Sequence, residues 1–262
     1  MDHKTAAIVL CAGIGSRMDG LPDDINKCAI PIAGTTPVSY TVSALLQSGV
    51  NKIVVVTGYA SDSVVSALAS CAETDKTAFV KNEFYDYHGC NYSLACGVVS
   101  QHCSDAERLI IAEGDSLLHR LSINKLIELG NGTSSLLRDS SYINYKRSVI
   151  AIGSGAGISR YEYDTAHSGL LPSLSDNEVI IGESMQLWSF SGDALKRLRK
   201  ILMEYKCAAD QSETAVKHSG VHSINQLDAR IRPVFSDCPD DWINLNTKQD
   251  LLKAERAQWL IK

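Results

Sequence analysis

The sequence predicts an α/β protein with a mostly parallel central sheet. Three observations carry this expectation. Short apolar runs alternate with helical stretches through the first half of the chain, their connections are short, and glycines or polar residues follow the apolar runs. Alternation of this kind favours parallel strands joined by right-handed crossovers. With 262 residues, 45% of them apolar, the chain can bury a sizeable core, and we expect a single domain over 1–262.

The elements of the first half follow in order. We expect strands at 6–10, 52–57, 77–81 and 109–112, with helices at 38–47, 62–71 and 92–101 between them. An apolar run bounded by glycines is typical of a buried strand that ends in a tight loop. Ligands of open parallel sheets lie at the carboxyl ends of the strands. One cleft can therefore hold residues 13–17, 58–59 and Asp115, which follow three of these strands.

The second half is richer in strands and turns. Strands are expected at 133–138, 147–153, 157–164, 179–189 and 229–235, as in an antiparallel insertion that receives a second substrate. Helices are expected at 192–206, 210–220 and 247–260, the last one capped by Asn246 or Thr247. The basic side chains of 192–206 are interpreted as a solvated face, because the leucines of that stretch share another face.

Composition excludes several classes of protein. A net charge of −5 gives no electrostatic footprint for nucleic acid. No apolar run reaches the ~18 residues that a membrane span needs, so no membrane insertion is expected. The first residues lack a signal-peptide pattern, and the eight cysteines have no C-x-x-C spacing. We interpret them as reduced thiols and expect a cytoplasmic protein.

The most specific pattern is the loop after the first strand. It contains Gly13, Gly15, Ser16 and Arg17, and Lys27 follows ten residues after the arginine. Glycines let backbone N–H groups approach a phosphate chain, and the two cations can bind the same oxygens. The pattern therefore indicates a bound nucleoside triphosphate, with a purely structural turn as the alternative.

Two other glycine motifs fit poorly. A dinucleotide fingerprint would need glycine where the chain has Met18, and the P-loop pattern G-x-x-x-x-G-K-[ST] does not occur. An NAD-dependent oxidoreductase is therefore disfavoured.

The segments L-C-A-G-I-G-S-R-M and N-K-C-A-I-P-I-A-G resemble the signature of the nucleotidyltransferases that make nucleoside-diphosphate derivatives. The similarity continues to residue 59 and returns in E-G-D at 113–115 and in W-I-N-L-N-T-K-Q-D-L near the end. This resemblance implies a single Rossmann-like nucleotidyltransferase domain. Its half 1–130 would bind the nucleotide, and 131–262 would form a β-rich acceptor-binding insertion and the C-terminal helix.

The resemblance also implies roles for individual residues. Arg17 and Lys27 would be the catalytic cations, on the β/γ-phosphates and the α-phosphate. The nucleotide cradle would consist of Leu10, Ala12, Gly13, Gly15 and Ser16 together with these cations. Asp115 stands where the family has its metal-binding aspartate, and Asn246, favoured over Asn244, would complete a Mg²⁺ site. The acceptor's phosphate or phosphonate is itself largely ionised, so no general base is needed.

The segment Asn91-Tyr92-Ser93-Leu94 indicates the donor nucleotide. It resembles the N-x-x-S-L of cytidylyltransferases that act on phosphocholine and small phosphonates, where sugar nucleotidyltransferases usually have G-T-A-x-A. CTP is therefore the expected donor. Asn91 and Ser93 would lie near the cytosine or ribose, and the rest of that wall would consist of Thr57, Gly58 and Glu113.

The acceptor site is expected in the β-rich half, at Tyr145, Glu183 and Trp188, with Arg138, Lys146 and Arg147 as nearby cations. A phosphonate needs cations, whereas an amine or a quaternary ammonium needs a carboxylate or an aromatic face. The expected acceptor is 2-aminoethylphosphonate or 2-hydroxyethylphosphonate, followed by phosphocholine and then a sugar 1-phosphate. A non-catalytic nucleotide-binding domain is the alternative from another class, and a homodimer is compatible with the sequence.

Overall fold

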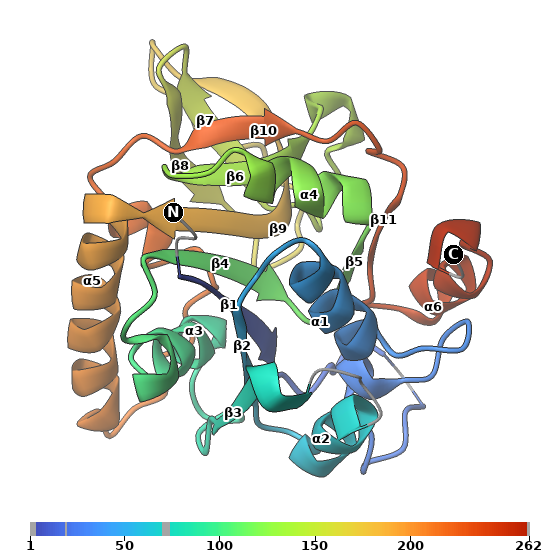
Figure 1. Ribbon diagram of the computed structural model, residues 1–262. Helices are drawn as coiled ribbons and strands as arrows, with labels where there is room; N and C mark the ends of the chain where they lie inside the picture. Colours follow the sequence, from blue (N-terminus) through green and yellow to red (C-terminus); the bar gives the residue numbers. More distant parts are fainter. Residues whose placement is uncertain (1–3, 19, 70–73, 261–262) are drawn as a thin grey trace.

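The computed structural model describes residues 4–18, 20–69 and 74–260 (Figure 1). Its strands are β1 (Thr5–Cys11), β2 (Lys52–Thr57), β3 (Thr77–Lys81), β4 (Arg108–Glu113), β5 (Ser116–Leu118), β6 (Ser134–Arg138), β7 (Ile150–Ser154), β8 (Gly157–Glu162), β9 (Val179–Ser191), β10 (Arg232–Phe235) and β11 (Trp242–Asn244). Its α-helices are α1 (Pro37–Gln47), α2 (Ser61–Ala69), α3 (Cys90–Val98), α4 (Arg120–Glu128), α5 (Gly192–Asp210) and α6 (Lys248–Glu255).

The central sheet confirms the predicted α/β class. Its strand order is β10-β6-β9-β4-β1-β2-β3, with β7 and β8 joined to it through β9. The pairs β1–β2, β1–β4, β2–β3 and β6–β10 are parallel. The long strand β9 is antiparallel to its neighbours β4 and β6.

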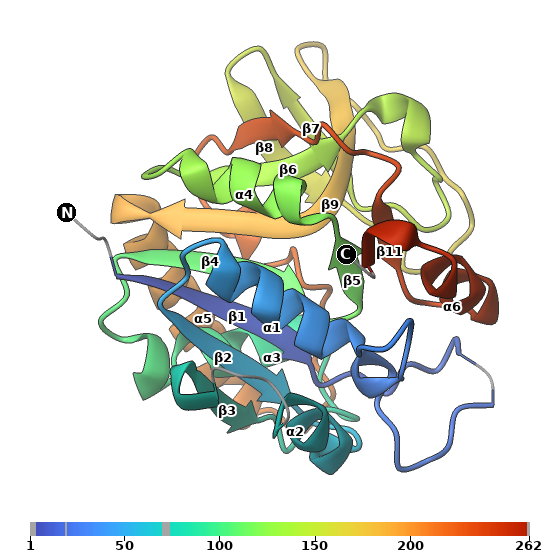
Figure 2. The same ribbon diagram turned by 45° about the vertical axis from the view of Figure 1, so that its right-hand side comes forward.

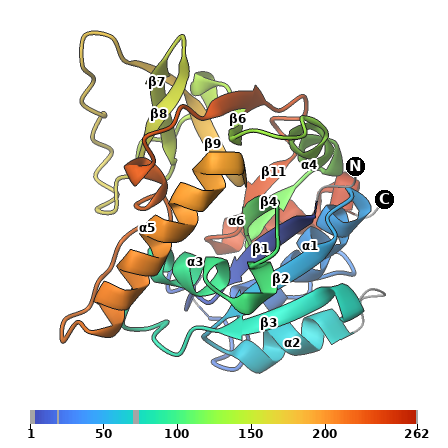
Figure 3. The ribbon, with the colours of Figure 1, turned by 60° about the vertical axis from the view of Figure 1, so that its left-hand side comes forward.

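Helices cover both faces of the sheet because the side chains of each strand alternate between them. In β1, Ile8 packs with residues of α3 and α5 on one face, whereas Val9 packs with residues of α1, α2 and α4 on the other. Figures 2 and 3 show these two layers from different sides. The inner strands β1, β2 and β4 are therefore almost entirely buried, as expected for parallel strands covered on both faces, whereas the edge strand β3 is partly exposed.

The predicted β-rich insertion is present as an extension of the same sheet. β7 and β8 form a hairpin, and β7 pairs with the first part of β9, residues 179–183. The second part of β9 lies between β4 and β6. The thirteen-residue strand β9 thus connects the parallel strands of the first half to the β-rich part.

Two expected helices differ in the structure. No helix forms at 210–220, because α5 itself runs to Asp210 and the following segment hydrogen-bonds to the start of α3, through Val216 to Gly89 and His218 to Asn91. The last helix ends at Glu255 and is followed by a 3-10 turn at Gln258–Leu260. Its cap is Thr247, in a capping box with Asp250, and not Asn246.

Other boundaries move by one to three residues, as is usual for helix ends. The helix expected at 62–71 is α2, and Cys71 lies outside the described residues. The helix expected at 92–101 is α3, which begins two residues earlier. Across the described part of the chain, no helix is both long and apolar enough to cross a membrane.

Candidate active site

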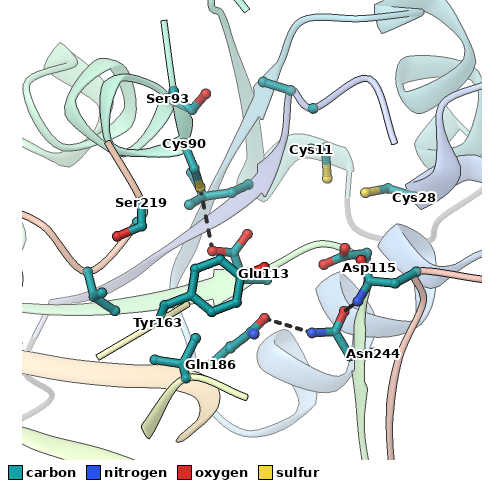
Figure 4. Close-up of a pocket in the computed structure, with 18 of the residues that line it drawn as sticks. Cys11, Cys28, Cys90, Ser93, Glu113, Asp115, Tyr163, Gln186, Ser219 and Asn244 are labelled. Carbon is teal, nitrogen blue, oxygen red and sulfur yellow. Dashed lines mark hydrogen bonds between the residues drawn. The ribbon is translucent and has the colours of Figure 1, made fainter. Parts of the chain in front are cut away.

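A cavity of about 280 Å³ opens at the carboxyl ends of β1 and β4 (Figure 4). Most of the predicted site residues line it, namely Leu10, Ala12, Gly13, Arg17, Lys27, Ser93, Glu113, Asp115, Trp188 and Asn246. Gly15 and Ser16 line a smaller neighbouring hollow together with Arg17, Lys27 and Asn246. The two hollows share these last three residues, so the loop of residues 13–17, called the glycine loop below, borders the main cavity.

The glycine loop is held by a residue that sequence reasoning missed. The buried Asn26 side chain donates to the carbonyls of Cys11 and Tyr59, at 2.9 Å each, and to that of Gly13 at 3.3 Å. It thereby connects the ends of β1 and β2, and its oxygen accepts from the N–H of Cys28. The only signal in the sequence was its position directly before Lys27.

Gly15 is required by both backbone and packing. Its φ is +72°, a conformation that favours glycine, and a Cβ there would stand 3.2 Å from Cδ of Lys27. The loop therefore lies directly on the Lys27 side chain.

Lys27 forms an ion pair with Asp115, and the two side chains are only 14% and 12% exposed. Burial alone would lower the pKa of Lys27, but the charge of Asp115, aided by Cys28, more than offsets it and raises that pKa. Lys27 is therefore charged at neutral pH and available to neutralise a phosphate.

Arg17 stands opposite Asn246. Its Nη2 donates to Asn246 Oδ1 at 2.7 Å. The β5–β11 pair explains why residues so distant in the chain meet, since β11 runs antiparallel to β5 and the N–H of Leu245 donates to the carbonyl of Asp115 at 2.9 Å. Asp115 and Asn246 thus lie at one edge of the cavity, each facing a cation.

The oxygen ligands at this edge suit Mg²⁺, but the protein supplies only two of them. Asp115 supplies a carboxylate and Asn246 an amide oxygen, which are hard oxygen ligands. Within 4–18, 20–69 and 74–260, no group of three or more His, Cys, Asp and Glu side chains could hold a metal ion. A Mg²⁺ ion here would therefore take most of its ligands from the triphosphate and water, as Mg²⁺ commonly does.

Glu113 also lines the cavity, two residues before Asp115. Burial, reinforced by the negative charge of Asp115, raises its pKa to about 7. The Cys90 thiol donates to its Oε1 at 3.7 Å.

The residues predicted for the base wall lie in different places, and only Ser93 and Glu113 of them line the cavity. Ser93 lines the cavity and its Oγ accepts from Asn82 at 3.0 Å. Asn91, Thr57 and Gly58 are not among the lining residues. A Cβ on Gly58 would stand 2.6 Å from that of Tyr85, so the loop before α3 covers this region.

The loop before α3 forms this part of the cavity wall through Tyr85, His88 and Gly89, and Cys90 at the start of α3 continues it. Asn91 instead exchanges hydrogen bonds with Ser223, at 2.9 and 3.2 Å. It thus anchors the segment whose residues 219–221 line the cavity.

The expected acceptor residues also divide. Trp188 and Arg147 line the cavity, whereas Tyr145 and Glu183 do not. Glu183 is 4% exposed, pairs with Arg138 at 2.5 Å and accepts from the Ser148 hydroxyl. Its carboxylate is therefore satisfied inside the β-rich part, which corrects the expectation that it faces an acceptor. The cavity is also lined by Tyr163, Gln186 and Ser219, which no pattern in the sequence marks.

Comparison with known proteins places the chain in a family. The family model described as "Domain of unknown function (DUF6564)" matches residues 37–258. The chain belongs to this family. Its fold is that of the nucleotidyltransferases, since the CTP:phosphocholine cytidylyltransferase of Streptococcus pneumoniae superimposes with a TM-score of 0.70. That match has 15% sequence identity and covers 96% of this chain and 98% of the other.

Curated relatives share shorter stretches. The CTP:phosphoglutamine cytidylyltransferase of Campylobacter jejuni is 30% identical over 123 residues, 46% of this chain and 47% of the relative. The 2-aminoethylphosphonate cytidylyltransferase of Lancefieldella rimae is 40% identical over 57 residues, 22% of this chain and 23% of the relative. The chain thus spans less than half the length of these relatives.

Proposed function

We propose that this protein is a Mg²⁺-dependent cytidylyltransferase. It would transfer CMP from CTP to a small phosphonate, of the 2-aminoethylphosphonate or 2-hydroxyethylphosphonate type, and release pyrophosphate. The observation that carries the proposal is the pairing of two cations with two oxygen ligands, Lys27 with Asp115 and Arg17 with Asn246, beside the glycine loop. A bound triphosphate can take the place of these oxygens beside the two cations, and a divalent ion can take the place of the cations beside Asp115 and Asn246.

The residues would act mainly by positioning and neutralising charge. Lys27 binds the α-phosphate, where negative charge develops, and Arg17 binds the phosphates that leave. Asp115 and Asn246 would hold Mg²⁺, which supplies charge neutralisation at the phosphate oxygens. The attacking oxygen of a phosphonate or phosphate is already ionised at neutral pH, so no side chain needs to remove a proton from it.

CTP is supported as the donor by the names of the relatives. Both curated relatives described above are cytidylyltransferases, and so is the structural neighbour. The N-Y-S-L segment at 91–94 agrees with them. Ser93, on the cavity wall, would contact the nucleoside.

The acceptor is proposed from the charges and rings of the cavity. Arg147 lines it and has no ion-pair partner among the described residues, which favours an anionic group. Phosphocholine is the second candidate because Tyr85, His88, Tyr163 and Trp188 also line the cavity, and aromatic faces bind quaternary ammonium groups.

A pyrophosphate-release assay tests the proposal. The protein is incubated with CTP and Mg²⁺, alone and with 2-aminoethylphosphonate, phosphocholine, phosphoglutamine or glucose 1-phosphate. Release should need CTP and an acceptor together and be fastest with 2-aminoethylphosphonate. Binding of CTP without release in any mixture would favour a non-catalytic nucleotide-binding domain.

A further inference from the structure

Four polar side chains, Arg17, Asn246, Asn244 and Gln186, form a hydrogen-bonded network along one wall of the cavity. Figure 4 shows its link between Asn244 and Gln186. Arg17 Nη2 donates to Asn246 Oδ1 at 2.7 Å. Asn246 Nδ2 donates to Asn244 Oδ1 at 2.8 Å, and Asn244 Nδ2 donates to Gln186 Oε1 at 3.2 Å. These hydrogen bonds connect Arg17, the proposed phosphate ligand, to Gln186 of β9.

The direction of this network is fixed at its start. A guanidinium group can only donate, so Asn246 must present its oxygen to Arg17 and its nitrogen to Asn244. The same reasoning gives Asn244 and then Gln186 a single orientation, although isolated amides can be flipped. A metal ion at Asn246 Oδ1 would impose the same direction, because a cation also requires the oxygen.

These hydrogen bonds leave the Gln186 side-chain nitrogen as a free donor. Its Oε1 is used by Asn244, and its Nε2 has no acceptor among the residues that the structure describes. Because Gln186 lines the cavity, a bound molecule is the natural acceptor for this N–H group.

The backbone of β9 is distorted at this residue. Gln186 has a φ of +58°, in a region that side-chain-bearing residues rarely adopt. The pairing with β6 passes from Ser135↔Trp188 to Leu137↔Ser184, so 185–187 lie opposite Leu136 alone. Bulges of this kind redirect a side chain and are frequent beside active sites.

We propose that Gln186 Nε2 donates to a non-attacking oxygen of the acceptor's phosphonyl or phosphoryl group. Asn244 and Asn246 are then positioning residues that keep this nitrogen, and not the amide oxygen, toward the acceptor. The inference rests on the proposed function and assigns the part of the site that recognises the phosphorus-bound oxygens. Asn244 lies between Gln186 and the Asp115 edge, where the α-phosphate would be attacked.

Steady-state kinetics of pyrophosphate release test the assignment, with 2-aminoethylphosphonate and phosphocholine as separate acceptors. Gln186→Leu removes the donor and should raise the KM of the acceptor about 10- to 100-fold, the usual range for a hydrogen bond to a charged group. The KM of CTP should change less than about twofold. Gln249→Leu, on the exposed side of α6, is the matched control and should change neither constant.

Asn244→Asp tests the direction of the network. A carboxylate only accepts, so Gln186 would turn its nitrogen to the new Asp side chain and its oxygen to the cavity. The KM of the acceptor should rise as in Gln186→Leu. In the Gln186→Leu background, Asn244→Asp should have no further effect on that KM.

The outcomes separate the two proposals. A wild-type protein that releases no pyrophosphate with either acceptor overturns the proposed function. If the wild-type protein is active, two results overturn this inference alone. One is an unchanged KM of the acceptor in Gln186→Leu, and the other is a further rise of that KM when Asn244→Asp is added to Gln186→Leu. An effect with both acceptors assigns Gln186 to their shared phosphorus-bound oxygens, and an effect on CTP alone refutes that assignment. Should Gln186→Leu not fold, Asn244→Asp by itself decides.

Discussion

At the scale of residues, the candidate site consists of cations already paired with the oxygens that a metal ion would use. Lys27 with Asp115 and Arg17 with Asn246 are held together in the free protein. The Lys27–Asp115 pair is buried, so its two charges satisfy each other before the substrate arrives, whereas Arg17 is exposed. Binding of a Mg²⁺–triphosphate would then exchange partners and would not bury an unpaired charge.

Lys27→Ala should lower kcat/KM for pyrophosphate release by about 100- to 1000-fold, the range found when one charge-stabilising donor is removed from an active site. The variant also leaves Asp115 without its partner, so its melting temperature should fall. Lys200→Ala, on the exposed side of α5, is the control and should leave both values unchanged. Undiminished turnover in Lys27→Ala would contradict the assigned role.

Asn26→Ala should destabilise the fold and weaken nucleotide binding together. It removes one side chain that serves three carbonyls, and each buried group left unsatisfied costs about 1–3 kcal/mol. Urea unfolding measures the stability, and titration with CTP and Mg²⁺ measures the affinity. Asn177→Ala, at an exposed position, should change neither. A stable variant with normal CTP affinity would show that Asn26 does not organise the loop.

The sequence predicted the residues that a short motif marks. Arg17, Lys27, Asp115 and Asn246 follow recognisable patterns at the ends of strands, and the structure brings them together. Asn26 and Gln186 have no such pattern. Their roles depend on carbonyls, amides and a bulge contributed by distant segments, which spacing along the chain cannot reveal.

At the scale of elements, the segment after α5 closes one side of the cavity. It carries Ser219, Gly220 and Val221 to the cavity wall and is tied to the start of α3 through backbone bonds to Gly89 and Asn91. A helix was expected here from the sequence. The bonds to α3 replace those that a local helix would have made, and they join segments more than a hundred residues apart.

His88 provides a pH-dependent contact between these elements. Its Nδ1 accepts from the N–H of Val216 at 3.2 Å, which requires an unprotonated nitrogen. Burial lowers the pKa of His88, partly opposed by Asp210 and assisted by Lys206. The unfolded chain therefore binds the proton more readily than the folded one, and this contribution to stability is present above about pH 6.5 and is lost as the pH falls below it.

The free energy of unfolding should accordingly decrease more between pH 7.5 and pH 5.5 in the wild-type protein than in His88→Asn. The asparagine oxygen can accept from Val216 but does not titrate. Urea unfolding at both values of pH gives the comparison, with His102→Asn as the control. Equal slopes for wild type and His88→Asn would mean that His88 does not sense pH in this way.

At the scale of the whole molecule, β9 decides how the two halves meet. It pairs antiparallel with β4 in the first half and with β7 in the β-rich part, so Gln186, Trp188 and the glycine loop border one cavity. The sequence predicted the strands of both halves and the parallel first half. It did not predict that β9 lies between β4 and β6, because pairing between distant strands depends on their fit and not on local pattern.

Because the cavity is built from both halves, substrate binding should stabilise the entire fold. At a CTP concentration of about 100 times its Kd, in the presence of Mg²⁺, the gain is about 2.7 kcal/mol, which corresponds to a rise in melting temperature of about 5–10 °C for a chain of this size. Mg²⁺ alone should raise the melting temperature only slightly, since Lys27 is already paired with the Asp115 carboxylate. GTP, UTP and NAD should give smaller shifts than CTP, and Asp115→Asn should remove the part that depends on Mg²⁺. A thermal-shift series of these nucleotides with and without EDTA makes the comparison, and an NAD shift equal to or larger than that of CTP would overturn the nucleotide assignment.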